Sequence, residues 1–359
     1  MRKLGILTGG GDCPGLNAVL RAVAKTATAQ GYEVIGFLDG YSGLVEERYM
    51  ILNTAAVSGL LHRGGTVLGT NNRDNPFHYP VRAGDNTAYE DRSQQALVNM
   101  DRIGLEALIT IGGDGTLAVG RDLARIGARV VGVPKTIDND LAATDQTFGF
   151  DTAVTTATEA LDRLHTTAES HHRIMVLELM GRYAGWIALQ SGLAGGADVI
   201  LIPEIEWKLE NVVAKIEERR RHGRAFSIVV VAEGAKTPGG EWVISRRVEG
   251  SVESVRLGGI GQVVGQLLEE TTGIETRVTV LGHIQRGGSP TAFDRVLATR
   301  FGVRAAQLAM EGTFGVTVCL RGNEVAYVSL EEATQKPRGV DPNSELMAAA
   351  RAIGISFGD

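Results

Sequence analysis

The strongest constraint on the fold of this chain is a repeated pattern in which a short apolar run is followed by a segment of helical period. Residues 4–8, 33–38, 107–111 and 129–133 are rich in β-branched residues and leucine, and the longer segments separate them. Strands that alternate with helices in this way form parallel sheets, because each helix returns the chain to the same end of the sheet. The N-terminal part is therefore predicted to be an α/β domain.

The same alternation restarts in the middle of the chain. A helix is predicted at about 150–167, and strands are predicted at 173–178, 199–202 and 227–232. A second α/β domain is the simplest interpretation. The length of 359 residues agrees with it, because a single hydrophobic core seldom grows beyond about 300 residues.

Charge and cysteine content exclude several classes of protein. The net charge of −6 argues against a broad nucleic-acid surface, which needs an excess of Lys and Arg. The two cysteines, Cys13 and Cys319, lie far apart, so a disulfide framework is not expected and a reducing compartment fits. The N-terminal residues reach glycines after a few positions, so the apolar region of a signal peptide is not expected there. No apolar run is long enough to span a membrane. We expect a cytoplasmic protein without nucleic-acid or membrane partners.

A glycine-rich loop, TGGGDCPG at residues 8–15, follows the first predicted strand and opens a helix. In an α/β sheet this position is the carboxyl edge, where ligands bind. The loop matches neither the dinucleotide fingerprint nor the P-loop, because no Gly-Lys-Ser/Thr follows the glycines. By itself it is compatible both with a tight turn and with phosphate binding.

A second loop, IGGDGT at residues 111–116, carries a carboxylate among its glycines. Glycine N–H groups can surround phosphate oxygens, but Asp114 would repel a phosphate unless a cation lay between them. The loop therefore indicates Mg²⁺. The alternative is that Asp114 caps a helix that starts near Thr116.

A third loop, PKTIDND at residues 134–140, also follows a predicted strand. Asp138 and Asp140, beside Lys135 and Thr136, have the composition of a site that activates a hydroxyl group and holds a metal ion. A turn rich in Asx residues would give the same letters for purely structural reasons.

Cationic residues recur in the second half of the chain, near the ends of predicted strands. They are Arg173, Arg182 in Met180-Gly181-Arg182, Arg277, and His283 and Arg286 in the glycine-rich segment 283–290. The guanidinium group suits phosphate oxygens. Each of these residues alone is also compatible with a solvated side chain or a surface ion pair.

Together and in this order, six motifs of the chain resemble those of the phosphofructokinase family, whose members phosphorylate fructose 6-phosphate at the 1-position. The motifs are TGGGDCPGLNAVLR, IGGDGT, PKTIDNDL, MGRYAGWIAL, VAEG and LGHIQRGGSPTAFDR, and they extend from Thr8 to Arg295. The resemblance implies ATP and fructose 6-phosphate as substrates, Mg²⁺ as cofactor, and the committing step of glycolysis as the role.

The resemblance also implies roles for individual residues. Asp138 would be the catalytic base, and Asp114 would bind Mg²⁺. The donor-binding residues would be Gly10, Arg73, Asp74, Gly113, Asp114, Gly115, Thr116 and Lys135. The substrate-binding residues would be Thr136, Ile137, Asp138, Arg173, Met180, Gly181, Arg182, Glu233, Arg277, His283, Ile284, Gln285 and Arg286.

The fold and assembly that the resemblance implies can be stated as expectations. We expect two Rossmann-like three-layer α/β/α domains with an active-site cleft between them. Residues 1–138 and about 252–305 would bind the donor, 139–251 and about 306–330 would bind the sugar phosphate, and 331–359 would form a C-terminal extension. In the family, Arg173 and Arg277 reach into a neighbouring subunit's site, which implies a homodimer or homotetramer with shared active sites.

Two positions bear on the phosphoryl donor and point in different directions. Gly115 stands where relatives that use pyrophosphate have Asp, whose carboxylate would occupy the space of a nucleotide's α-phosphate. Lys135 is typical of the pyrophosphate users, whereas many ATP users have Gly there. We give Gly115 more weight, because the missing carboxylate removes a block while the lysine only adds attraction. ATP is the predicted donor, and pyrophosphate is the alternative.

Two other functions compete with this one. A lipid or NAD kinase also has a GGDGT loop, but it would leave PKTIDNDL and LGHIQRGGSP without a role. A sensor of nucleotides or sugar phosphates would keep the fold without the chemistry. A sensor has no need for the predicted base, Asp138, together with Asp114 and Arg182.

Overall fold

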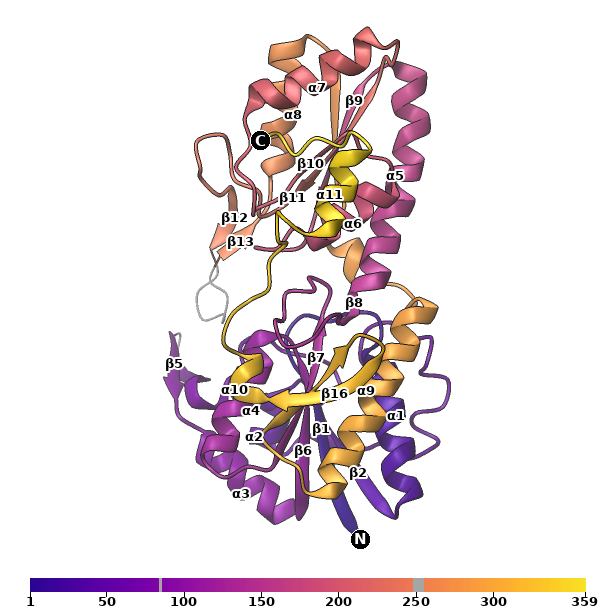
Figure 1. Ribbon diagram of the computed structural model, residues 1–359. Coiled ribbons are helices and arrows are strands. Elements are labelled where there is room, and N and C mark those ends of the chain that lie inside the picture. Colours follow the sequence, from indigo (N-terminus) through magenta and orange to yellow (C-terminus); the bar gives the residue numbers. More distant parts are fainter. Residues whose placement is uncertain (84–85, 248–254) are drawn as a thin grey trace.

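The structure is a computed structural model of the chain, and it describes residues 1–83, 86–247 and 255–359. Its helices and strands form two lobes, one above the other, each built around a sheet (Figure 1). Helices cover both faces of each sheet, so the predicted fold class of two three-layer α/β/α domains is confirmed. In the part of the chain that the structure describes, no helix is long and apolar enough to cross a membrane.

The first domain contains a sheet with the strand order β16-β15-β7-β6-β1-β2-β3, in which β8 also pairs with β7. Its central strands are parallel, and β3 and β16 run antiparallel to their neighbours. The strands are β1 (Arg2–Thr8), β2 (Tyr32–Phe37), β3 (Tyr49–Ile51), β6 (Leu105–Gly112), β7 (Val130–Thr136), β8 (Phe148–Gly149), β15 (Val316–Arg321) and β16 (Glu324–Ser329). The helices are α1 (Leu16–Ala29), α2 (Tyr41–Glu46), α3 (Ser93–Ile103), α4 (Asp114–Arg125), α9 (Ala292–Glu311) and α10 (Leu330–Ala333). A 3-10 turn, η1 (Pro76–His78), leads into the antiparallel pair β4 (Tyr79–Ala83) and β5 (Asn86–Glu90).

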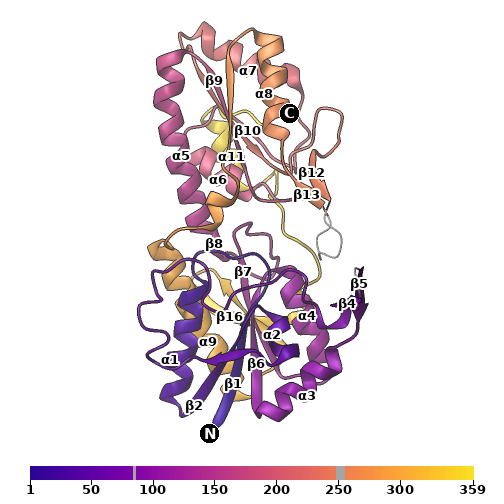
Figure 2. The same cartoon turned by 180° about the vertical axis from the view of Figure 1, so that it is seen from behind.

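Strand β6 shows why these residues form a strand between two helical layers. Ala107 and Ile109 pack with α1 and α9 on one face, while Leu105 and Leu108 pack with α2, α3 and α4 on the other. Figure 2 shows these two groups of helices on opposite sides of the sheet. A strand buried on both faces needs an almost continuous apolar run, which is what the sequence has here.

The second domain contains a parallel sheet with the strand order β10-β11-β9-β14. The strands are β9 (Ile174–Leu179), β10 (Val199–Leu201), β11 (Ser227–Ala232) and β14 (Thr276–Val280). Helices α7 (Leu209–Arg221) and α8 (Ile260–Thr272) cover one face, and α5 (Phe150–His171), α6 (Trp186–Ala194) and α11 (Glu345–Ala352) cover the other. The antiparallel strands β12 (Ile244–Arg247) and β13 (Val255–Leu257) and the 3-10 turn η2 (Gly282–Arg286) complete the domain.

The strand pairing corrects the predicted domain boundaries. Strand β14 lies in the segment 252–305 assigned to the first domain, but it pairs with β9 in the second. Strands β15 and β16 lie in the segment 306–330 assigned to the second domain, but β15 pairs with β7 in the first. The predicted boundary at 251/252 falls outside the described residues. Periodicity indicates what kind of element a segment forms, but it does not indicate which sheet a strand joins.

The segment 331–359 is also not a separate extension. Helix α10 packs against the first domain, whereas Met347 of α11 lies in the core of the second, and Ser356 pairs with Val199 beside β10. The chain therefore passes from the first domain to the second, back to the first, and again to the second. The last of these passages is the extended segment between α10 and α11 (Figure 1).

Candidate functional site

The motif loops of both domains meet between the lobes. In the first domain they follow β1, β6 and β7, which are neighbours in the sheet, so their carboxyl ends adjoin. In the second domain the segments after β9, β11 and β14 adjoin in the same way. Two pockets, of about 740 and 2030 Å³ including open solvent, lie at this junction. They share lining residues from both domains, so they form one cleft.

Most of the predicted site residues line this cleft. The first pocket is lined by Gly10, Asp74, Gly113, Asp114, Gly115, Thr116, Lys135, Thr136, Asp138, Arg182 and Arg286. The second pocket is lined by Gly10, Arg73, Met180, Arg182, Glu233, His283 and Arg286. The structure thus brings together residues that the sequence separates widely, although it does not assign a role to any of them.

Six predicted substrate residues do not line the cleft, and three of them are Ile137, Ile284 and Gln285. Ile137 is fully buried in the core, and Ile284 is 67% exposed. Gln285 is also fully buried, and its Oε1 accepts a hydrogen bond of 2.9 Å from the backbone N–H of Met180. Gln285 does not face the cleft, but its hydrogen bond positions Met180, which lines the second pocket.

Gly181 lines neither pocket, but it shapes the turn that carries Arg182. Its φ is 138°, and a Cβ at this position would lie 2.6 Å from the carbonyl oxygen of Ala184. Only glycine fits both constraints. Arg182 itself has a φ of 52°, which is unusual for a residue with a side chain and is found most often where a turn serves a site.

Arg173 and Arg277 lie at the opposite edge of the second sheet from the cleft. They occur at the amino ends of β9 and β14, while the cleft is at the carboxyl ends. Both contact Glu275: Arg173 Nε lies 2.5 Å from its Oε2, and Arg277 Nη2 also binds it. Within one chain, these two arginines are therefore not brought to the site.

The loop after β7 leaves the Asp138 carboxylate available. The backbone N–H of Asp138 donates to Thr136 Oγ1 (3.0 Å), and the N–H of Thr147 donates to Asn139 Oδ1 (3.1 Å). The side chain of Asn139, rather than that of Asp138, therefore makes a structural hydrogen bond in this loop. Asp138 Oδ1 is buried and has no hydrogen-bond partner among the described residues, and Oδ2 lies 3.6 Å from Arg182 Nε. This ion pair joins the two domains across the cleft.

Asp114 is the first residue of α4, and it does not cap the helix. The cap position is Gly113, and no side chain makes a capping hydrogen bond there. The alternative that Asp114 is a structural cap is therefore not supported. Its carboxylate lines the first pocket, next to the free N–H groups of the first helical turn.

Several acidic groups lie close together in the cleft. Burial, and then the negative charges of Asp138 and Asp114, raise the pKa of Asp140 to about 7. Burial, and then the charge of Asp138, raise the pKa of Glu233 to about 7. Buried carboxylates that lie this close together indicate a place for a cation or for hydroxyl donors.

Lys135 is the only basic residue in the motif loops of the first domain. Its side chain is almost fully buried, and its Nζ donates a hydrogen bond to the carbonyl oxygen of Gly11. Burial lowers the pKa of Lys135, and the charges of Arg286 and Arg182 lower it further. The ammonium group therefore already links two of the motif loops.

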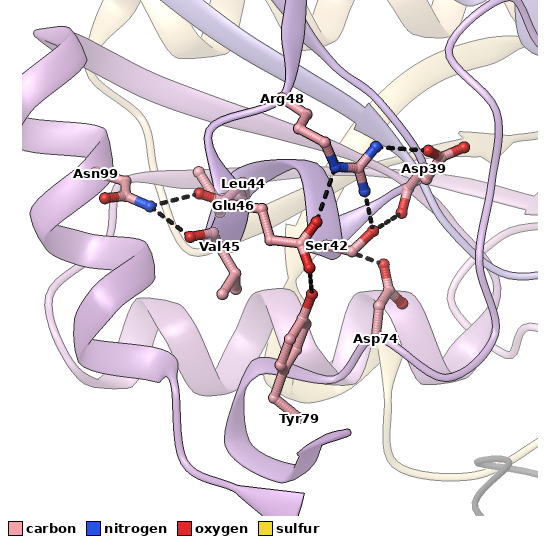
Figure 3. A network of polar contacts seen from close by, with 9 residues as sticks. All are labelled: Asp39, Ser42, Leu44, Val45, Glu46, Arg48, Asp74, Tyr79 and Asn99. Carbon is pink, nitrogen blue, oxygen red and sulfur yellow. Dashed lines mark hydrogen bonds and ion pairs between the residues drawn. The ribbon is translucent and has the colours of Figure 1, made fainter. Parts of the chain in front are cut away.

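Asp74 connects the cleft to a polar network around α2 (Figure 3). Its Oδ2 accepts a hydrogen bond of 3.0 Å from the backbone N–H of Ser42, and burial raises its pKa to about 6. Ser42 Oγ donates to the carbonyl oxygen of Asp39 (2.6 Å), and Arg48 binds the Asp39 carboxylate (2.7 Å). The network therefore links Asp74, which lines the first pocket, to the beginning of α2.

The sequence interpretation missed several residues that line the cleft, including Tyr41, Asn71, Asn72, Arg246 and Arg256. Tyr41 follows β2, so the rule that ligands bind at carboxyl ends of strands would have found it; its hydroxyl donates to the carbonyl oxygen of Thr116 (2.8 Å). The other four lie in no motif that identifies them.

Comparisons with known proteins agree with the motif pattern. The family model described as phosphofructokinase matches residues 3–309. The chain is 54% identical over its full length to ATP-dependent 6-phosphofructokinase 2 of Clostridium perfringens, covering 99% of that protein. It is 51% identical over 99% of its length to the pyrophosphate--fructose 6-phosphate 1-phosphotransferase of Streptomyces coelicolor, covering all of that protein.

Among solved structures, the chain is similar to phosphofructokinase from Saccharomyces cerevisiae. The TM-score is 0.79 and the sequence identity is 32%. The similarity covers 93% of this chain and 45% of the yeast chain. The fold described above is thus shared with a solved phosphofructokinase structure.

Proposed function

Because the chain belongs to the phosphofructokinase family, we propose that it transfers the γ-phosphoryl group of ATP to the 1-hydroxyl of fructose 6-phosphate. The observation that carries this proposal is the contact of Asp138 with Arg182 across the cleft, at the place where the two pockets join. One pocket takes the donor and the other takes the acceptor. In this role the enzyme acts in glycolysis, in the cytoplasm.

Asp138 is the catalytic base of the proposed reaction. Its Oδ1 is a buried acceptor without a hydrogen-bond partner among the described residues, and a sugar hydroxyl can donate to it. As the hydroxyl oxygen attacks the γ-phosphorus, its proton passes to Asp138. Arg182 Nε, 3.6 Å from Asp138 Oδ2, holds the carboxylate in the cleft.

The first pocket suits a Mg²⁺ ion bound together with the donor. The described residues contain no cluster of three His, Cys, Asp or Glu side chains that could hold a metal ion alone. Mg²⁺ is commonly held by one or two carboxylates, by water and by substrate phosphates, and Asp114 supplies a carboxylate next to a helix N-terminus. When bound, the ion neutralises charge on the β- and γ-phosphates. Asp138 and Asp140 line the same pocket as Asp114, and this group of carboxylates supports a cation at this place.

The second pocket suits the sugar phosphate. Glu233, with a pKa near 7, lies where it can hydrogen-bond sugar hydroxyls, and its Oε1 accepts a hydrogen bond from the Arg182 backbone. Arg286 supplies positive charge for the phosphate, and His283 supplies a ring N–H that can donate to it. Arg173 and Arg277 complete the clamp in a site of a neighbouring subunit, so we propose a homodimer or homotetramer with shared active sites. Their distance from the cleft of their own chain supports this arrangement.

ATP is the proposed donor, and pyrophosphate is the second candidate. Gly115 lines the first pocket and adds no carboxylate to it. Lys135, the residue that favours pyrophosphate, already donates to the carbonyl oxygen of Gly11. The specific observation in favour of pyrophosphate is the similarity to the Streptomyces coelicolor enzyme, which is nearly as high as that to the ATP-dependent relative.

The test is a coupled assay with fructose 6-phosphate and Mg²⁺, run with ATP and with pyrophosphate. We expect turnover with ATP; turnover with pyrophosphate alone would overturn the proposed donor. The variant Gly115→Asp should raise the KM for ATP at least tenfold, because a carboxylate then repels the donor phosphates. Gly115→Ala is the matched control, since it adds bulk without charge. Glucose 6-phosphate and NAD, as alternative acceptors, should give no product.

A further inference from the structure

The extended segment 334–340, which we call the crossing segment, passes along the loop that carries the proposed base. It leaves α10 in the first domain and runs to the second domain (Figure 1). Pro337 forms an antiparallel bridge with Leu141, and the backbone N–H of Arg338 donates to the carbonyl oxygen of Asp140 at 2.6 Å. Asp140 is two residues from Asp138, so the crossing segment supports this loop directly.

The side chain of Arg338 holds the far end of the same loop. Its Nη1 donates to the carbonyl oxygens of Thr144 (2.9 Å) and Asp145 (2.7 Å). The guanidinium carbon lies 4.7 Å from the ring centre of Trp186, so the planar group stacks on an aromatic residue of the other domain. Trp186 Nε1 in turn donates to the carbonyl oxygen of Arg338 at 3.0 Å.

Trp186 lies at the end of the turn that carries Arg182. It is the first residue of α6, and the preceding residue, Gly185, donates its N–H to Glu204 Oε1 at 2.9 Å. The same oxygen accepts the N–H of Val340 at 2.7 Å. Glu204 therefore connects the crossing segment to the turn that carries Arg182. Arg338 connects the crossing segment to the loop that carries Asp138.

These contacts close a ring around the site. Asp138 contacts Arg182, the turn continues to Trp186, Trp186 contacts Arg338, and Arg338 contacts the loop of Asp138. We propose that Arg338 is a positioning residue for phosphoryl transfer, which sets the separation of Asp138 and Arg182 through its contacts with the 138–145 loop and Trp186. This inference rests on the proposed function. Misplacement of a reacting group by about 1 Å can cost on the order of 100-fold in rate.

The experiment compares Arg338→Ala with Arg351→Ala. Arg351 is a matched control because it also stacks on an aromatic ring, Phe357, and binds two oxygen atoms, those of Asp359, but it contacts only the second domain. For Arg338→Ala we expect kcat to fall by about 10- to 100-fold, with both KM values within about threefold of wild type. Arg351→Ala should keep the wild-type kcat.

The split between kcat and KM separates positioning from a merely structural role. Circular dichroism and thermal melts, recorded at the assay temperature and above, give the folded fraction of each variant. An unchanged kcat, or a fall in kcat no larger than the fall in folded fraction, would overturn the inference. If the wild-type enzyme itself does not phosphorylate fructose 6-phosphate, the proposed function fails instead.

Two milder variants keep the test sharp if Arg338→Ala does not fold. Arg338→Lys keeps the charge but loses the fork and the flat stacking surface, so kcat should fall less than in Arg338→Ala. Trp186→Phe keeps a ring and loses only the indole N–H bond, and a loss of about 2- to 5-fold is expected. In the double variant of Arg338→Lys and Trp186→Phe, the effects should be less than additive because the two residues share one contact. Additive effects would contradict the inference that Arg338 acts through its contact with Trp186.

Discussion

In the first pocket, the two domains contribute side chains of largely opposite charge. On the side of the first domain, Asp114, Asp138 and Asp140 line the pocket, and the one lysine is engaged by a carbonyl oxygen. On the side of the second domain, Arg182 and Arg286 line both pockets. Both sides are proposed to hold phosphate groups, but all the arginines that line the first pocket come from the second domain.

This difference in charge indicates which side of the cleft needs a cation to bind phosphate. An acidic side repels a donor phosphate chain unless Mg²⁺ accompanies it, whereas a basic side binds the sugar phosphate unaided. The acidic side also supplies the base, because a carboxylate can accept a proton and an arginine cannot. Substitutions on the two sides should therefore change different kinetic constants.

The largest effect is expected at the acidic side, from Asp138→Asn. The amide cannot accept the hydroxyl proton, so kcat should fall by about 10²- to 10⁴-fold, with little change in either KM. Steady-state kinetics with both substrates varied gives the three constants. The exposed Asp162 on α5 provides the control, since Asp162→Asn removes the same charge away from the cleft. A loss of less than threefold in kcat would show that another group is the base.

Arg277 is proposed to reach the sugar-phosphate site of a neighbouring subunit, so Arg277→Ala should mainly weaken binding of the sugar phosphate. Loss of a hydrogen bond between charged groups costs about 1.5–3 kcal/mol, so the KM for fructose 6-phosphate should rise by about 10- to 100-fold. The KM for ATP should change far less. Equal increases in both constants would remove Arg277 from the proposed clamp.

The Mg²⁺ requirement tests the comparison directly. Asp114→Asn should raise the Mg²⁺ concentration needed for half-maximal rate by about tenfold, because one charged oxygen ligand is lost. Titration of MgCl₂ at fixed ATP measures it. Arg182→Lys, on the other side of the cleft, should leave the Mg²⁺ midpoint unchanged. An equal shift in both variants would contradict the proposal that only the acidic side binds Mg²⁺.

The smallest effect is on stability and depends on pH. The pKa of Glu233 is raised from 4.5 to about 7, so the folded protein binds this proton more tightly than the unfolded chain does. The resulting stabilisation is complete below pH 4.5 and is lost as pH rises through 7, at a cost of up to about 3 kcal/mol. Glu233→Gln should therefore raise Tm relative to wild type by a few degrees at pH 8 and by less at pH 5, without ligands.

The control for this prediction is Glu241→Gln, which alters an exposed glutamate after the same strand. Its Tm should follow that of the wild type at both pH values. A stabilisation by Glu233→Gln that is larger at pH 5 than at pH 8 would mean that the carboxyl group is not buried in the way described.

The motif loops were predictable because each follows a strand in the sequence. Strand ends such as Thr8 and Gly112 stand at one edge of a parallel sheet, so local patterns located Asp114 and Asp138. The features that could not be predicted depend on strand pairing and contacts between residues far apart in the sequence. The patterns alone do not tell that β14 joins β9, or that Arg338 returns beside Asp140. Arg256 was missed for a similar reason, because it reaches the cleft from a strand pair that carries no motif.

The bridge between Ser356 and Val199 has a consequence for biosynthesis. Strand β10 is the outer strand of its sheet, and the segment at 356 covers its open backbone groups through bonds to Asp198 and Ile200. A ribosome that adds about 5–20 residues per second completes this cover roughly 10 to 30 s after β10 has been made. During that interval the nascent sheet has an unprotected edge that can pair with another chain. Stalled or truncated products that end before residue 340 should therefore aggregate, which pelleting of arrested chains can measure.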